Sequence, residues 1–140
     1  MKYLEKKAIT AAMVCSLLIG VLSISVCSDA KSTYWLSGVS ELADGHMKMY
    51  YKGSTITLKG KIKKSASRKN VYDATEKKYS CSLKVANNCK VTLVEADNNQ
   101  TMTYKKWAKG NNYKKGAKVS FIEATFKIDG GKITRIYFSA

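Results

Sequence analysis

Hydrophobic and polar residues follow a period of two along residues 54–64, STITLKGKIKK. Ile56, Leu58 and Ile62 fall on one side of an extended chain, while threonines and lysines fall on the other. A period of two is typical of a half-buried β-strand, so this segment is predicted as the first strand of a domain. Gly60 shares the inward side, where the absence of a side chain allows a bulge or sharp coiling.

The same period returns in YSCSLKV (79–85) and CKVTLVEA (89–96), which are predicted as a second and a third strand. Between them, ANN predicts a turn. The inward positions are Tyr79, Cys81, Leu83, Val85, Cys89, Val91 and Leu93. The polar, irregular segment 65–78 predicts a long loop between the first and second strands.

A helix is predicted at TMTYKKWAKG (101–110), with Asn99 or Thr101 as its N-cap and Gly110 at its end. Lysines interleaved with rings are also typical of a nucleic-acid groove. However, Tyr104, Trp107 and Ala108 are spaced i, i+3, i+4 and form one stripe, with the lysines off it. The stripe favours rings that face the core.

Two further strands are predicted at 114–128 and 132–139, joined by a tight DGG hairpin turn. The inward parity changes between Phe121 and Ala124, which predicts a bulge near residues 122–123. The last strand shows a similar slip. The order is therefore three strands, a helix and two strands, an all-β domain with one short helix.

The chain begins with features of a secretory signal peptide, predicted over residues 1–30. MKYLEKK is basic, residues 8–26 carry no charge, and Ser28 and Ala30 suit the −3 and −1 positions of a cleavage site before Lys31. We rank an uncleaved membrane anchor second and a lipoprotein attached at Cys27 third. Residues 31–53 are predicted as a lead-in, with a short helical turn capped by Ser40 and with Trp35 and Leu36 packed back on the domain; residues 54–140 form that domain.

Two segments, YKGSTITLKGKI and YKKGAKVSFIEATFKIDGGKITRIYF, are similar to the openings of strands one and four in small bacterial exported OB-fold proteins of the tRNA-anticodon-domain-like group. The resemblance covers about residues 51–138 and implies a five-stranded OB-fold-like barrel. A cystatin-like roll or another small exported β-barrel remains the alternative fold.

The resemblance also implies a ligand site on the outer face of strands two and three and in the loop after strand one, where such proteins bind oligonucleotides or oligosaccharides. Together with the outward lysines of strand one, the candidate binding residues are Lys59, Lys61, Arg68, Lys69, Tyr72, Lys84 and Lys90. The strands of this face carry no aromatic side chain for base stacking. The face therefore suits a salt-sensitive hold on a polyanion better than a specific single-strand site.

Charge points to the same class of partner. The formal net charge is +15, and removal of the predicted signal, with three lysines and two acids, leaves +14. A basic exported protein meets anionic polymers and surfaces such as nucleic acid, polysaccharide and envelope polymers. The alternative is a structural or protein-interaction domain whose charge serves solubility or wall retention. Arg68 and Arg135 are the only arginines, which weakens the polyanion interpretation because phosphate sites favour arginine.

No catalytic set is recognisable, so the chain is predicted to be no enzyme and to need no cofactor or metal. His46 is the lone histidine, and the carboxylates form no paired or clustered set. Membrane contact is expected only through an uncleaved signal segment. Cys81 and Cys89 form an even pair in an exported chain, which predicts a disulfide. That bond and a tight Asn-Asn hairpin exclude each other, since the hairpin would set the two residues ~16 Å apart; buried thiols are the alternative.

Overall fold

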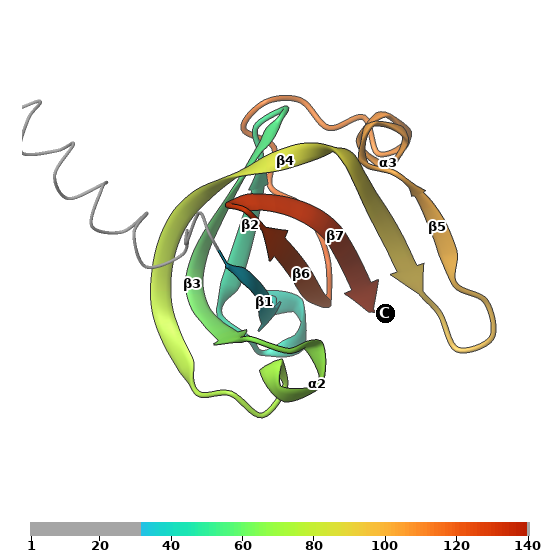
Figure 1. Ribbon diagram of the computed structural model, residues 1–140. Coiled ribbons are helices and arrows are strands. Elements are labelled where there is room, and N and C mark those ends of the chain that lie inside the picture. The colour runs from blue at the N-terminus through green and yellow to red at the C-terminus, as the bar shows by residue number, and fades with distance from the viewer. Residues whose placement is uncertain (1–31, 140) are drawn as a thin grey trace, which may run out of the picture.

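The structure, a computed structural model, describes residues 32–139, so the predicted signal peptide and its cleavage point lie outside the described residues. A 7-stranded sheet runs in the order β2-β3-β1-β6-β7-β4-β5, and β3 also pairs with β4 (Figure 1). This additional pairing closes β3, β1, β6, β7 and β4 into a ring around one hydrophobic core. The prediction of a β-rich domain with a short helix is confirmed, and the helix predicted over residues 101–110 spans Tyr104–Gly110.

In chain order the elements are β1 (Thr33–Val39), η1 (Glu41–Ala43), β2 (Met47–Tyr51), β3 (Thr55–Ser65), α2 (Arg68–Val71), β4 (Glu76–Val94), β5 (Gln100–Thr103), α3 (Tyr104–Gly110), β6 (Glu123–Asp129) and β7 (Lys132–Ser139).

Strand β3 follows the alternation closely, because one face meets the core and the other meets water. Ile56, Leu58 and Ile62 are fully buried. Gly60 has a φ of 109°, and a Cβ at this position would lie 1.8 Å from the carbonyl oxygen of His46. Only a residue without a side chain lets β2 approach β3 here, which is a different role from the predicted bulge or sharp coiling.

Residues 33–51, predicted as a lead-in, form strands β1 and β2 of the same sheet, so that prediction is wrong. β1 lies between β3 and β6 and pairs with β6 along its whole length. Leu36 is buried in the core as expected, whereas Trp35 points to the outer face and is only half-buried. The turn capped by Ser40 is confirmed as η1, with the Ser40 side chain accepting a bond from the Leu42 N–H.

The predicted second and third strands form one continuous strand, β4, so the Asn-Asn turn between them is also wrong. The first part of β4 pairs with β3, and its last part pairs with β5. β7 runs parallel to both parts, with a register irregularity between Val85 and Lys90. Pairing with β7 on both sides of the asparagines outweighs their local preference for a turn.

The predicted disulfide between Cys81 and Cys89 is wrong, because Cys89 is a free, buried thiol. Both residues lie on β4, eight positions apart, which corresponds to ~26 Å along an extended strand. A disulfide needs Cα atoms within ~7 Å of each other. Cys81 itself takes part in a disulfide, which is not the predicted one.

The predicted fourth strand is shorter than expected, since β6 begins only at Glu123. The change of inward parity is confirmed: Val119 and Phe121 are buried, and the series then continues from Ala124. The chain before it lies against the edge of β2, where the Val119 N–H donates to the Met49 carbonyl at 2.8 Å. The slip in the last strand is confirmed as a register shift between β6 and β7.

Helix α3 packs its ring stripe into the core, as predicted. Tyr104, Trp107 and Ala108 are buried, while the lysines of the helix are exposed. The Trp107 ring centroid lies 5.3 Å from that of Phe138. The N-cap is Thr103, whose side chain accepts a bond from the Lys106 N–H, so the predicted caps at residues 99 and 101 are wrong.

Candidate functional site

Three of the predicted binding residues lie on one outer face of the sheet, over β2, β3 and the first part of β4. Lys59 lies opposite Lys48 on β2, and Lys61 lies opposite Lys78 on β4. Lys84 lies farther along β4, opposite Thr55. We call this surface the lysine face and define it by Lys48, Lys59, Lys61, Lys78 and Lys84.

Hydroxyl groups fill the spaces between these lysines. Thr57 and Ser82 lie opposite each other, and their hydroxyl oxygens are 2.8 Å apart. The ammonium group of Lys59 lies 5.7 Å from the centroid of the Tyr50 ring. The lysine face is therefore basic and rich in hydroxyl groups, which is the chemistry that a polyanion surface requires.

Helix α2 carries three other predicted residues to a different place. Its Ser67 cap accepts a bond from the Asn70 N–H, and Val71 is fully buried beneath the helix. The hydroxyl oxygen of Tyr72 lies 3.4 Å from Oγ1 of Thr125, a buried residue on the outer face of β6. α2 therefore covers part of the outer face of β1 and β6, and Lys69 and Tyr72 are exposed at its rim.

Arg68 points from α2 onto an aromatic surface that the sequence analysis missed. Its guanidinium carbon lies 3.9 Å from the Tyr137 ring centroid on β7 and 5.9 Å from that of Trp35 on β1. The two rings are 6.2 Å apart. Arg135 lies 5.8 Å from the Tyr137 centroid, and the Lys127 ammonium lies 5.9 Å from the Trp35 centroid. We call this set of five residues the arginine face.

Cross-strand pairing holds the arginine face together. Trp35 lies opposite Lys127, and Lys127 lies opposite Arg135. Lys90, predicted to sit with Lys84, instead lies opposite Arg135 on the other side of β7. A row of aromatic and cationic side chains therefore crosses β1, β6, β7 and β4. The predicted binding residues are thus divided between the two faces.

The cations of the arginine face have little negative charge beside them. Lys127 forms a half-exposed ion pair with Asp129 at 3.7 Å. Hydrogen bonds donated by Thr33 and Thr134 lower the pKa of the Asp129 carboxyl, and Lys127 lowers it further. Like charges on one surface repel one another, and the repulsion is stronger where water is excluded. An anion bound between the cations would relieve this repulsion.

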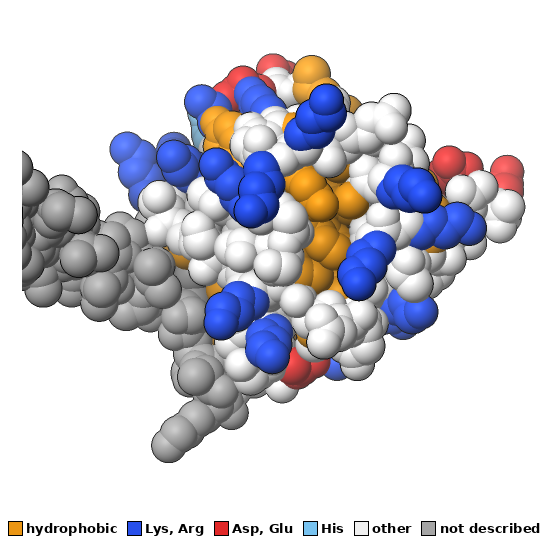
Figure 2. All heavy atoms as spheres, turned by 90° about the horizontal axis from the view of Figure 1, so that it is seen from above, with side chains coloured by type: hydrophobic (Ala, Val, Ile, Leu, Met, Phe, Trp, Pro, Cys, Tyr) orange, Lys and Arg blue, Asp and Glu red, His pale blue; other side chains and the backbone are white. Residues whose placement is uncertain are grey.

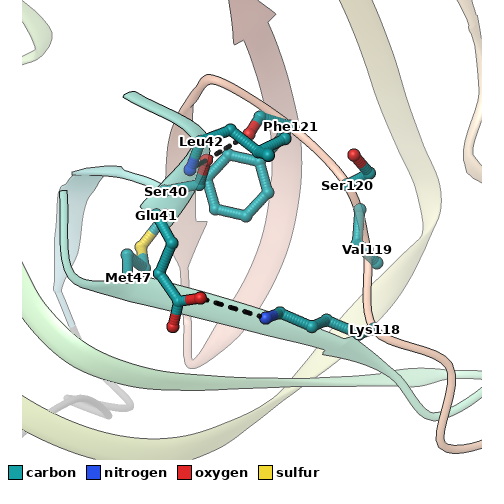
Figure 3. Close-up of a pocket in the computed structure, with 8 residues that line it drawn as sticks. All are labelled: Ser40, Glu41, Leu42, Met47, Lys118, Val119, Ser120 and Phe121. Atoms are coloured by element: carbon teal, nitrogen blue, oxygen red, sulfur yellow. Dashed lines mark hydrogen bonds and ion pairs between the residues drawn. The ribbon is translucent and has the colours of Figure 1, made fainter. Parts of the chain in front are cut away.

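An apolar cavity of about 240 Å³ lies at the η1 end of the sheet (Figure 3). Met47, Val119 and Phe121 form its inner wall. On its rim, the carboxylate of Glu41 pairs with the ammonium groups of Lys48 at 3.2 Å and Lys118 at 3.5 Å, and these lysines lower the pKa of the carboxyl.

A second cavity, of about 370 Å³, lies beside α3. Tyr51, Tyr104 and Lys105 are among the residues that line it.

Within residues 32–139, no group of three or more histidine, cysteine or acidic side chains is placed to hold a metal ion. No helix in that part of the chain has the length and apolar character needed to cross a membrane. No protein-family model matches this chain, and comparisons with curated proteins and with solved structures likewise return no match.

Proposed function

We propose that the protein is an exported, non-catalytic binding module that docks on an anionic polymer or surface. The observation that carries this proposal is the position of its arginines. Arg68 and Arg135, the only two in the sequence, come from distant elements and both lie within 6 Å of the Tyr137 ring centroid. Arginine was the residue whose scarcity argued against a phosphate or sulfate site.

Stacking on a ring leaves the N–H groups of a guanidinium free to donate to an anion, often as a bidentate pair. It also fixes the side chain, so that less conformational entropy is lost when the anion binds. The neighbouring Lys127 and the more distant lysine face add long-range attraction. This combination supports docking on a polymer that carries phosphate, sulfate or carboxylate groups.

Export is part of the proposal, supported by the charge-free segment 8–26 that follows a basic start. An OB-type barrel is proposed as the fold. It is supported by the ring of strands, by α3 preceding the last hairpin, and by the parallel pairing of β4 with β7. The continuous β4 departs from the OB pattern of two hairpin-connected strands.

The test compares two pairs of substitutions that remove the same charge. Arg68→Gln with Arg135→Gln changes the arginine face, whereas Lys106→Gln with Lys109→Gln removes two exposed lysines from α3. Binding of fluorescein-labelled polyphosphate and elution from heparin are measured from low salt to about 150 mM NaCl. We expect a loss of affinity of about tenfold or more for the first pair and less than about threefold for the second.

Equal losses for both pairs would show that binding depends on net charge alone, which contradicts a site at the arginine face. Absence of binding by the unsubstituted protein at about 150 mM NaCl would contradict polymer docking altogether.

A second candidate function, docking of a protein partner, is favoured by the apolar cavity in Figure 3. Leu42 beside it is 68% exposed, and Ile122, whose carbonyl accepts a bond from the Ser40 N–H, is 39% exposed. A photo-crosslinking residue at position 42 should then give one discrete product, identified by mass spectrometry, in the host envelope. Position 106 serves as the exposed control. The same products from both positions would count against this candidate.

A further inference from the structure

The edge of β4 is interrupted beside α3. On this edge β3 pairs with β4 only as far as Thr55 opposite Lys84, and β5 pairs with it only from Thr103 opposite Lys90. β3 and β5 therefore lie end to end along the same side of β4, with residues 85–89 between them. The Val85 N–H donates to the Ser54 carbonyl at 2.8 Å, which closes one end of this gap.

The cavity of about 370 Å³ lies at this gap between β3 and β5. Its volume falls at the lower end of the range for ordinary ligand pockets, ~300–1,000 Å³. We call it the α3 slot and define it by Tyr51, Ser54, Asn87, Thr103, Tyr104 and Lys105. Figure 2 looks down on this end of the molecule and shows a hollow strip of hydrophobic side chains with lysines and arginines on both sides.

Two tyrosine rings supply the apolar wall of the α3 slot, and both are held in place. Their centroids lie 6.0 Å apart. The Tyr104 hydroxyl donates to the Gly53 carbonyl at 2.6 Å, and the Tyr51 ring stacks on Tyr113 at 5.9 Å. Fixed rings can pack against a flat or ring-shaped ligand at little entropic cost.

The polar groups of the α3 slot are amide, hydroxyl and ammonium groups. Asn87 and Ser54 offer hydrogen bonds to a ligand, and Lys105 contributes a positive charge. A Cβ built on Gly53 would lie 3.5 Å from Cε of Lys115, so a second lysine chain passes close to this turn. Among the described residues that line the slot there is no aspartate or glutamate, so an anionic group meets no like charge there.

We propose that the α3 slot binds a ring-bearing phosphate, with its ring against the two tyrosines and its phosphate toward Lys105. Nucleotides and sugar phosphates share this chemistry. The slot is distinct from the arginine face, and this proposal stands without polymer binding.

The test uses the full mature chain and three probes: adenosine monophosphate, glucose 6-phosphate and inorganic phosphate. Binding is followed by two-dimensional NMR shift changes. We expect one of the two organic phosphates to bind about tenfold or more tightly than inorganic phosphate, and to shift the amides of residues 51–54, 85–87 and 103–105. The organic phosphate that binds more tightly shows whether the ligand of the slot is a nucleotide or a sugar phosphate.

Lys105→Gln should weaken binding of that probe about fivefold or more, whereas Lys106→Gln, at an exposed neighbour outside the slot, should change its affinity less than about twofold. The thermal midpoints of both variants should match that of the unsubstituted protein. Arg68→Gln with Arg135→Gln should leave the affinity of the probe unchanged, which separates this proposal from polymer docking. Three results would each overturn it: equal binding of all three probes, equal effects of the two lysine variants, and shifts confined to the arginine face.

Discussion

Truncation of Trp107 tests whether the basic, aromatic stretch around α3 is core or binding surface. Trp107 is 4% exposed, and its ring centroid lies 5.7 Å from Tyr104, 5.1 Å from Tyr113 and 5.3 Å from Phe138. Removing a buried aromatic ring of this kind costs ~3–5 kcal/mol, because burial is lost and a cavity remains. A domain of this size has only ~5–15 kcal/mol of stability in total.

We therefore expect Trp107→Ala to lower the thermal midpoint by ~12–20 °C, since a domain of about 100 residues loses ~4 °C per kcal/mol. The urea midpoint should fall by ~2 M at an m-value of ~2 kcal/mol/M. Lys106→Ala, exposed on the same helix, is the control and should change stability by no more than ~0.5 kcal/mol. Heparin binding, measured well below the new midpoint, should be unchanged. A Trp107→Ala protein with unaltered stability and lost heparin affinity would refute the core assignment.

Three further predictions concern other parts of the sheet. Gly60→Ala should prevent folding or lower the thermal midpoint far more than Gly116→Ala, because both glycines have a positive φ but only at Gly60 would a Cβ meet backbone, at 1.8 Å. Burial raises the pKa of the Cys89 thiol to about 11, so at pH ~8 iodoacetamide should label this thiol ~100-fold more slowly in the folded protein than in denaturant; equal rates would contradict its burial. The lowered pKa of Asp129 means that its stabilising effect is present above the unfolded pKa of ~3.9 and is lost as pH falls through the lower folded value. When pH is lowered from ~6 to ~2, the thermal midpoint of Asp129→Asn should therefore fall by fewer degrees than that of the unsubstituted protein.

Strand β3 and helix α3 were predictable because each has one face in water and one in the core. Period-two alternation in β3 and the i, i+3, i+4 stripe in α3 describe those environments directly. β4 was not predictable in the same way. It changes antiparallel partner from β3 to β5 midway while staying paired with β7. The polar break at Asn87 and Asn88 marks this exchange of partners rather than a turn.

The outward positions of β1 were missed for a different reason. Ser37 is buried although it points away from the core, because α2 covers it and its hydroxyl lies 3.2 Å from that of Thr125. A local pattern gives no sign of such a cover, which comes from a loop some thirty residues later. Two of the five residues of the arginine face did have a signal in the sequence. The parity slip that sends Ile136 and Phe138 inward also sends Arg135 and Tyr137 outward.

Under the proposed function, the lysine face mainly affects the rate of association with a polyanion, and the arginine face mainly affects the rate of dissociation. Lysines on extended strands contribute charge with little fixed geometry, so the lysine face raises the local concentration of any polyanion and its effect falls steeply with salt. The arginine face adds stacked guanidinium groups whose donors are oriented before the ligand arrives, and this contribution is screened less. Lys59→Gln with Lys61→Gln should therefore mainly slow association and flatten the salt dependence, whereas the arginine variants should mainly speed dissociation. Stopped-flow binding of polyphosphate resolves the two rates, and the same change in both rates for both variants would show that the two faces form a single diffuse field.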